Sequence, residues 1–587
     1  MTTLLAFATA ALALTGVGTS VASAAPRIVH VDPVHGRDAW PGTTPARAKR
    51  TLTAAWNTIP LRRTLTQGVT IRLAPGAYAP TATPNYWESR WGSRSAPIII
   101  ESRTGIASSV RLPSINMFDA RFLTIRNVTI QSKFDPFHCE LCRDIVVRDS
   151  VLAGIGDPRR DQGPQETIKV NQSTGVSLIG NDISGATDNA IDFVAVQRGL
   201  IARNRVHRAR DWCAYVKGGS ASIVLEQNHV HDCGTGGITA GQGTGLEFMT
   251  APWVRYEAYD IAIRSNVIHD IEGAGIGVNG GYDVVVAHNT MQRVGERDHV
   301  IEIVFGERSC DGNAPACAAR IATGGWGPPA PGGDPVPIGN RGVRVANNLV
   351  VNPPPYRSQY THFAIYQPRP LPTNGVGPNP AVADDELRIT GNVISNGPAD
   401  LELGVGPDQG CQDTNPTCNA AQLRADNAIN AGPVDATDLF GALTPGASLL
   451  NATVPAIPAF AWDDTTVPAG TIPDAVSTDR DGRIRTGTAP VGAHAARPLT
   501  SAVTVRANGP RAVLVGAVGS SSRRSCPSST CSYQVLRGDW LELRAVTTAG
   551  TRVSRWLGAC TGTVGPTCFV HATGAAVQAR VIIASAR

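Results

Sequence analysis

The chain has 587 residues, of which 42% are hydrophobic and 17% charged; this composition is typical of folded globular proteins and excludes a disordered chain. Gly (61) and Pro (42) are frequent but follow no collagen period, so we expect many short elements joined by turns. The net charge of +5 is too small to predict nucleic-acid binding, although it does not repel an acidic polymer.

The first residues predict export. Residues 4–17 are apolar but too few to span a bilayer. Ala22-Ser23-Ala24 matches the small-residue pattern of a cleavage site. We therefore expect residues 1–24 to be a signal peptide and the mature protein to be secreted, without a membrane span.

The cysteines agree with this compartment. There are 12, and an even number in an exported chain predicts disulfides. Cys139 and Cys142 form a CxxC motif, but no second CxxC accompanies it, so we interpret it as a staple rather than a redox or zinc site. The expected local pairs are Cys139/Cys142, Cys213/Cys233, Cys310/Cys317, Cys411/Cys418, Cys526/Cys531 and Cys560/Cys568.

An asparagine-centred repeat runs through the middle of the chain. Each copy is a short apolar strand followed by Asn, any residue and an aliphatic residue, and from Asn181 to Asn204 the distance is 23 residues. A period in the twenties with three short strands predicts a solenoid. Asn suits the turn, because it tolerates left-handed backbone and can bond the same Asn one rung above. The copies lie at Asn127, Asn181, Asn204, Asn228, Asn266, Asn289, Asn348 and Asn392, with Asp149 in that place in one rung.

Further motifs flank the repeat. Val31-Asp32-Pro33 precedes residues 50–59, which predict a helix, and Asp479-Arg480-Asp481-Gly482-Arg483 lies near the other end. With these motifs, residues 28–495 resemble the right-handed parallel β-helix proteins of the pectate-lyase-like superfamily. The resemblance implies an all-β, three-sheet solenoid over residues 25–497, capped at its N-terminal end by the helix.

The last part of the chain has a different pattern. Residues 498–587 are rich in β-forming residues, Ser and Cys, and the stretch from Arg555 to Cys560 with Cys568-Phe569-Val570 is similar to small bacterial β-repeat domains. We expect this part to form a small disulfide-containing β domain, which begins near Pro498.

The resemblance implies that each Asn turn separates the second and third sheets of the solenoid, so the strand that follows the third-sheet strand belongs to the first sheet. The strands of that sheet are residues 167–171, 190–194, 213–217, 237–241, 275–279 and 300–304. Side chains alternate along a strand, so one set should point inward and the other should share one outer face. The outer set is Lys169, Asn171, Asp192, Tyr215, Lys217, Thr239, Asn279 and Glu302. Insertions at 153–166, 242–260 and 305–342 would build walls beside this face.

The stretch from Asp211 to Asn228 resembles the lysine-bearing rung of alginate- and chondroitin-type lyases. Lys217 falls on the lysine of that family, which makes it the candidate base. The two glutamates that precede the lysine in the family are replaced by Arg210 and Trp212 in this chain, so the match supports Lys217 alone. With Lys169 beside it and loops around it, the pKa of Lys217 would be lowered. Lys169 and Arg297 would neutralise the substrate carboxylate or assist.

Two further sets of residues are candidates for the same face. Asp188, Asp192 and Glu302 offer hard oxygen ligands for Ca²⁺, or they form an ion network with the lysines. Tyr215, Asn279 and His299 would contact substrate, and Trp253 and Tyr256, with Tyr259 and Trp326, would stack on sugars or instead cover the sheet as a satellite core. A column of His207, His231 and His269 on the third sheet favours a structural stack over a zinc site.

These patterns predict an exported enzyme, a monomer, whose partner is an acidic polysaccharide. The first hypothesis is a lyase that cleaves a uronate-containing polymer by β-elimination. A glycoside hydrolase with Asp188, Asp192 or Glu302 as acid and base is an alternative, as is a uronate epimerase. A third class is a non-catalytic glycan-binding protein of the cell surface.

Overall fold

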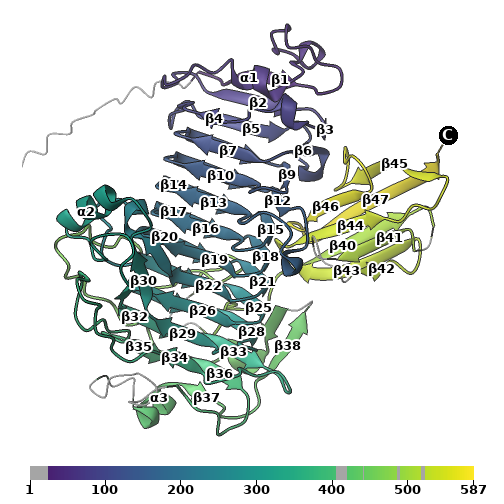
Figure 1. The fold of residues 1–587 in the computed structure, drawn as a ribbon. Helices are drawn as coiled ribbons and strands as arrows, with labels where there is room; N and C mark the ends of the chain where they lie inside the picture. The colour runs from purple at the N-terminus through teal and green to yellow at the C-terminus, as the bar shows by residue number, and fades with distance from the viewer. Residues whose placement is uncertain are drawn as a thin grey trace, which may run out of the picture.

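The computed structural model describes residues 24–404, 415, 419–439, 442–485, 490–509, 511–516, 518 and 523–586. The central part is a parallel β-helix, in which each rung passes through three sheets in turn (Figure 1). We call them sheets C, A and B; they are the first, second and third sheets of the sequence analysis. All neighbouring strands within these three sheets are parallel. The predicted all-β solenoid with three sheets is therefore confirmed. The predicted signal peptide lies outside the described residues, apart from Ala24.

The strands of the three sheets are short and regular. Sheet A contains β1 (Arg27–Val31), β2 (Val69–Leu73), β5 (Ile98–Ser102), β8 (Arg121–Arg126), β11 (Arg143–Arg148), β14 (Thr174–Ile179), β17 (Gln197–Ala202), β20 (Ser220–Glu226), β24 (Ala258–Arg264), β27 (Gly281–Ala287), β32 (Arg341–Ala346) and β35 (Arg388–Thr390). Sheet B contains β3 (Gly76–Ala77), β6 (Val110–Leu112), β9 (Thr129–Ser132), β12 (Val151–Gly154), β15 (Asp182–Ala186), β18 (Arg205–Ala209), β21 (His229–Cys233), β25 (Val267–Ile271), β28 (Thr290–Val294), β33 (Leu349–Asn352), β36 (Val393–Asn396) and β37 (Ala428–Ile429). Sheet C contains β4 (Trp87–Glu88), β7 (Ile115–Phe118), β10 (Phe137–Glu140), β13 (Ile168–Asn171), β16 (Ile191–Val194), β19 (Trp212–Lys217), β22 (Gly236–Gly241), β26 (Ala274–Asn279), β29 (Ile301–Val304) and β34 (Phe363–Ile365).

The core fills the inside of the β-helix with aliphatic side chains from all three sheets. Every residue that the alternation predicts to point inward on sheet C belongs to this core, from Ile168 to Ile303. Stacking buries these side chains because no single rung could shield its own apolar face from water. The helix α1 (Leu52–Trp56) contacts β1 at the N-terminal end, with Leu52, Ala55 and Trp56 buried. It lies within the predicted range of 50–59.

An asparagine ladder joins the rungs at the turn between sheets A and B. Successive Nδ2–H groups donate to the next Oδ1 at 2.8–3.1 Å. The ladder runs through Asn181, Asn204, Asn228, Asn266, Asn289, Asn348 and Asn392, and it ends at Asn427, which the repeat did not predict.

Two details of the predicted repeat are wrong. The left-handed residue is the one before the ladder position, as at Arg203 and Gln227, and not the ladder asparagine itself. Asn127 and Asp149 occupy this left-handed place, with φ of 55° and 50°. Ser150 takes the ladder position in the rung of Asp149, where its backbone N–H donates to Asn181 Oδ1. A left-handed residue and an amide ladder are adjacent in sequence, so the pattern alone could not separate them.

Side elements surround the β-helix. A three-stranded sheet consists of β23 (Gly243–Gly245), β30 (Gly306–Ser309) and β31 (Val336–Ile338). The chain then adds α2 (Ala314–Ala322), α3 (Ala420–Asp426), β38 (Ala436–Leu439), β39 (Ala442–Pro445) and α4 (Ala447–Leu450). Short 3-10 turns are η1 (Pro45–Arg47), η2 (Pro80–Ala82), η3 (Ala107–Ser109), η4 (Pro158–Arg160) and η5 (Leu246–Phe248).

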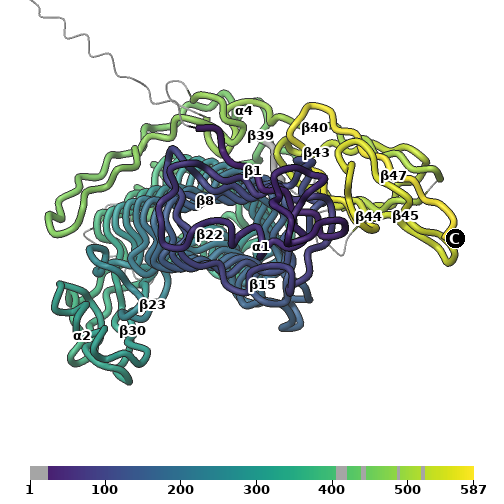
Figure 2. Tube along the Cα trace, turned by 90° about the horizontal axis from the view of Figure 1, so that it is seen from above, coloured from purple at the N-terminus to yellow at the C-terminus, as the bar shows by residue number. Residues whose placement is uncertain are grey.

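Eight strands after Pro498 form two small sheets around their own core. One sheet has the order β43-β40-β47-β45 and the other β42-β41-β44-β46. The strands are β40 (Thr500–Ala507), β41 (Val513–Gly516), β42 (Arg524–Ser525), β43 (Thr530–Leu536), β44 (Trp540–Ala545), β45 (Thr551–Gly558), β46 (Thr567–His571) and β47 (Ala576–Ser585). Figure 2 shows these strands and the lobe around α2 on different sides of the β-helix.

Five of the predicted disulfides are present: Cys139–Cys142, Cys213–Cys233, Cys310–Cys317, Cys526–Cys531 and Cys560–Cys568. The predicted pair of Cys411 and Cys418 lies outside the described residues. Within the described part of the chain, no helix has the length and apolar character needed to cross a membrane.

Candidate functional site

The outer face of sheet C carries the predicted residues in the predicted register. Lys169 pairs with Asp192, Asp192 with Tyr215, and Tyr215 with Thr239, so these side chains form one column across successive rungs. Lys217 lies in the neighbouring column, opposite Val194. Lys169 and Lys217 are thus two rungs and two residues apart, about 12 Å between Cα atoms, and not side by side.

A cavity of about 510 Å³ opens on this face. We call it the lysine pocket. From sheet C it is lined by Lys169, Asp192, Tyr215 and Lys217 among others, and Asp188 borders it from the turn before β16. The opposite wall is formed by Gly243, Thr244, Gly245, Phe248 and Asp311, which come from two of the predicted insertions.

Lys169 is held by two buried carboxylates. Its Nζ lies 3.0 Å from Asp192 Oδ2 and 3.1 Å from Glu166 Oε1, and both carboxylate side chains are only 2% exposed. Burial opposes the charge on Lys169, but Asp192 and Glu166 outweigh it and raise the pKa of the ammonium. Burial also raises the pKa of Glu166 to about 7, although Lys169 pulls it down. Lys169 is therefore a fixed cation and does not serve as a base at neutral pH.

Lys217 has a different environment. Its Nζ is 3.0 Å from Gln242 Oε1 and 4.4 Å from the centre of the Tyr215 ring. Among the described residues, no carboxylate comes within 4.0 Å of this amine. Both partners are uncharged, so in the described part of the chain Lys217 differs from Lys169 in having no carboxylate paired with its amine. Burial, then Asp192, raises the pKa of the neighbouring Tyr215 phenol.

The turn after Lys217 fixes its position. Gly218 and Gly219 both have left-handed backbone, and a Cβ on Gly219 would lie 1.9 Å from the carbonyl oxygen of Trp253. The Gly218 N–H donates to Glu257 Oε2. Glu257 is fully buried and pairs with Arg308 at 2.6 Å. The two glycines therefore let the 242–260 insertion pack directly on the lysine strand.

Glu302 and its neighbours form a separate cluster. Asn279 Nδ2 donates to Glu302 Oε1 at 3.0 Å, and Thr239 Oγ1 donates to Asn279 Oδ1 at 2.9 Å. Burial raises the pKa of Glu302 to about 7. His299 Nδ1 contacts Asp298 at 2.6 Å in the preceding turn. Four rung steps of about 4.8 Å separate Glu302 from Asp192, a distance of about 19 Å.

The predicted calcium ligands therefore do not meet. Asp188 and Asp192 border the lysine pocket, whereas Glu302 lies about 19 Å from Asp192. The place between Asp192 and Glu166 is taken by the Lys169 ammonium. This donor set does not fit a resident Ca²⁺, because the lysine already supplies the positive charge that its carboxylates need.

Arg297 does not join the lysine pocket. It lies in the loop between β28 and β29, its side chain is 60% exposed, and it pairs with Glu272 at 3.0 Å. The structure thus offers no contact between this guanidinium and Lys169 or Lys217.

The predicted sugar-stacking aromatics face another way. Trp253 is 5% and Tyr256 9% exposed, and both pack with Tyr259 and Tyr282 near the first residues of strands β24 and β27 of sheet A. Trp326 packs against Tyr256, 4.9 Å between ring centres. These rings form a satellite core under the insertions, the alternative interpretation of the sequence, because apolar insertions gain most by covering the sheet edge.

Several residues that sequence reasoning missed line the lysine pocket, and Glu166 and Phe248 are the two that matter most for its chemistry. Glu166 comes three residues before Lys169 at the end of an insertion, a spacing that could have indicated an ion pair. Phe248 is 50% exposed and lines the cavity, although it lies in the same insertion as Trp253. Nothing in the sequence distinguishes which aromatic of that insertion faces the pocket.

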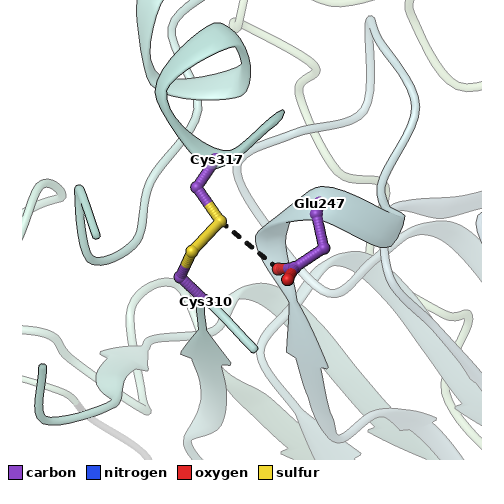
Figure 3. Close-up of side chains that lie close together, drawn as sticks. All are labelled: Glu247, Cys310 and Cys317. Carbon is purple, nitrogen blue, oxygen red and sulfur yellow. Dashed lines mark hydrogen bonds between the residues drawn. A yellow bond between two sulfur atoms is a disulfide. The ribbon is translucent and has the colours of Figure 1, made fainter. Parts of the chain in front are cut away.

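One group of close metal-ligand types occurs in the described residues: Glu247, Cys310 and Cys317 (Figure 3). The two sulfurs are bonded to each other at 2.05 Å. This group is a disulfide with a neighbouring carboxylate, and it lies behind the wall that carries Phe248.

Residues 107–251 match the family model of the right handed beta helix region. No curated protein matches the sequence. Among solved structures, a rhamnogalacturonan lyase is 13% identical to this chain, with a TM-score of 0.37. The match covers 68% of this chain and 98% of the lyase chain. A complex of XylC with xylose is 10% identical with a TM-score of 0.44, covering 80% and 98%. The mannuronan C-5 epimerase AlgE6 A-module of Azotobacter vinelandii is 10% identical with a TM-score of 0.32, covering 56% and 92%. At such values these likenesses carry no argument about substrate, and the fold rests on the sheet topology described above.

Proposed function

We propose that the protein is an exported enzyme that cleaves an acidic, uronate-containing polysaccharide by β-elimination in the lysine pocket. The observation that carries the proposal is Lys217, which lines the cavity and whose amine has, among the described residues, the uncharged Gln242 and Tyr215 as its partners. The five disulfides support export, because disulfides persist in oxidising compartments.

The reaction needs three things from the pocket: a base, a positive charge for the uronate carboxylate, and a proton for the leaving oxygen. The amine form of Lys217 would take the proton α to the carboxylate. The electron pair of that C–H bond then forms the new C=C bond as the bond to the glycosidic oxygen breaks. The leaving oxygen takes up one proton, which the Lys217 ammonium can return. Lys169, 28% exposed, would attract the carboxylate from the other side of the pocket.

A glycoside hydrolase is the second candidate, favoured by the pKa of about 7 at Glu166, which suits a general acid. Two observations weaken it. Glu166 and Asp192 are each 2% exposed beneath the Lys169 ammonium. Glu302, another predicted acid or base, lies in the other cluster about 19 Å from Asp192, although Glu140 and Asp311 also line the pocket with Asp188.

The deciding experiment follows the ultraviolet absorbance of unsaturated uronate during incubation with pectate, alginate and glycosaminoglycans. We expect the absorbance to rise with the parent protein. The rate of this rise should be at least 100-fold lower in Lys217→Ala, which is the lower end of the effect of losing a general base. Lys133→Ala, at an exposed lysine outside the pocket, is the matched control and should keep the rate. A flat absorbance with release of new reducing ends would favour the hydrolase. A rise that persists in Lys217→Ala would refute Lys217 as the base.

A further inference from the structure

We propose that Phe248 is a sugar-binding platform, on which one pyranose ring of the substrate lies while its charged groups face Lys169 and Lys217. The identity of the ligand rests on the proposed function. The position of the platform rests on four features of the structure: the exposure of the ring, a strap across the pocket, a brace behind its wall, and the chemistry of the cavity.

The first observation is the exposure of Phe248. It is 50% exposed, while Leu246 and Met249, which flank it in the same turn, are fully buried. Those two pack with Val254 and the Cys310–Cys317 disulfide. The two buried anchors therefore hold an aromatic ring in contact with solvent. Exposed apolar surface that is fixed in this way is typical of binding sites.

The second observation is a strap across the pocket. Gln172, in the turn after β13, donates from Nε2 to the carbonyl oxygen of Phe248 at 3.1 Å. Gln172 and Phe248 both line the cavity. The strap therefore ties the backbone of Phe248, on one wall of the pocket, to the turn after β13 on the sheet C side.

The third observation is a brace behind the wall. Glu247 Oε1 accepts hydrogen bonds from the backbone N–H groups of Asp311 and Asn313, at 2.9 and 3.2 Å. Its other oxygen lies 3.3 Å from Cys317 Sγ, as Figure 3 shows. The Glu247 carboxylate is thus engaged on the side of the disulfide, and Phe248 is the residue of this turn that faces the pocket.

The fourth observation is the chemistry of the pocket. A pyranose ring has an apolar C–H face and a polar edge. Phe248 offers an exposed aromatic surface at the rim, while Lys169, Lys217 and Gln165 offer polar groups elsewhere in the same cavity. A flat apolar surface opposite charged donors suits a sugar acid, because the ring face gains by burial and the carboxylate by the cations. The volume of about 510 Å³ is that of a small-ligand pocket.

The experiment measures binding of oligosaccharides by calorimetry in a Lys217→Ala background, so that turnover does not interfere. Phe248→Ala should raise the Kd of a uronate oligosaccharide about tenfold, and Phe248→Tyr should restore it, because the ring face remains. Phe134→Ala is the matched control, since Phe134 is 79% exposed but does not line the pocket. Gln172→Ala should give an intermediate loss.

The outcomes separate this proposal from the proposed function. Equal Kd values for Phe248→Ala and its parent, or a Phe248→Tyr variant as weak as Phe248→Ala, would overturn the platform while leaving Lys217-dependent turnover intact. Absence of binding for every sugar would overturn it as well. Neutral oligosaccharides that bind through Phe248, without lyase activity on any uronate polymer, would uphold the platform and refute the lyase.

Discussion

Lys169 shows how a single residue organises the pocket. Glu166 and Asp192 are buried, and the second oxygen of each, Oε2 and Oδ1, is shielded from solvent and has no hydrogen-bond partner among the described residues. Two buried carboxylates so close together are stable only because an ammonium lies between them. Lys169 therefore stabilises the fold in addition to any contact with substrate, and its contribution to the free energy of unfolding can be measured.

Replacement of Lys169 by Met should lower the free energy of unfolding by about 3 kcal/mol at neutral pH, because two buried carboxylates lose their cation. The loss should be larger at pH 8 than at pH 5. The pKa of Glu166 is already raised to about 7, so the folded state favours its protonated form, and stability falls as pH rises towards that value. Urea unfolding at both pH values checks this.

A triple variant, Lys169→Met with Glu166→Gln and Asp192→Asn, is the control for that experiment. It removes the charges as well as the cation and should recover most of the loss. A triple variant as unstable as Lys169→Met alone would mean that side-chain packing, and not the uncompensated charge, is responsible.

At the scale of one element, the asparagine ladder carries the turn between sheets A and B. Each ladder amide is fully used: Asn228 Nδ2 donates to Ile201 O and Asn266 Oδ1, and its Oδ1 accepts from Asn204. All members are buried, so no water could replace a lost partner.

Asn228→Ala should therefore cost about 2–4 kcal/mol, since it removes the amide that bonds the Ile201 carbonyl and the backbone N–H of Asn204. Asn127→Ala is the comparison, because Asn127 lies in the left-handed place beside the ladder position, and this substitution should cost only about 1–2 kcal/mol. Thermal unfolding of both variants tests the assignment. Equal losses would contradict the placement of Asn127 outside the ladder.

The same turn explains how much of the site could be predicted. The asparagine period sets the register, and a correct register places Lys169, Asp192, Tyr215 and Lys217 on one outer face. Distances along the axis could be predicted too, since rungs repeat at about 4.8 Å. This spacing alone places Glu302 far from Asp192. The insertions have no period. Whether Trp253 or Phe248 faces the pocket depends on how an irregular loop packs, which no repeat encodes.

At the scale of the whole molecule, the C-terminal strands dock on the outer face of sheet B through buried polar contacts. Trp540 donates from Nε1 to the Gly180 carbonyl, and Arg205 donates to the carbonyl of Trp540. Asp539 accepts from Arg480 and lies 3.0 Å from His229 Nδ1. The predicted column of His207, His231 and His269 is stacked beneath this interface, with ring centres 4.8–4.9 Å apart.

Docking places histidines where a positive charge is unfavourable. Burial lowers the pKa of His229 and of His231 to about 3. His231 Nε2 accepts from Arg205, so that ring is neutral. His229 Nε2 lies 2.7 Å from His269 Nε2, so one of these two rings must lack a proton at Nε2. Burial also raises the pKa of Asp182 to about 7, and Asp182 lies against His207. Burial also lowers the pKa of His207, so the shifts of Asp182 and His207 change stability in opposite directions as the pH falls.

The docked arrangement should consequently loosen as the pH falls. A histidine whose pKa is lowered by burial contributes its full stability above about 6.5 and loses it as pH falls towards 3, so burial of His229 and His231 should favour the docked arrangement less at pH 5 than at pH 7. Small-angle scattering should show a larger radius of gyration at pH 5.

His229→Gln with His231→Gln keeps hydrogen-bonding groups but cannot titrate, so this variant should stay docked at pH 5, whereas His138→Gln on sheet C should open like the parent. A parent with the same radius at both pH values, or a double variant that opens with it, would show that these histidines do not control docking.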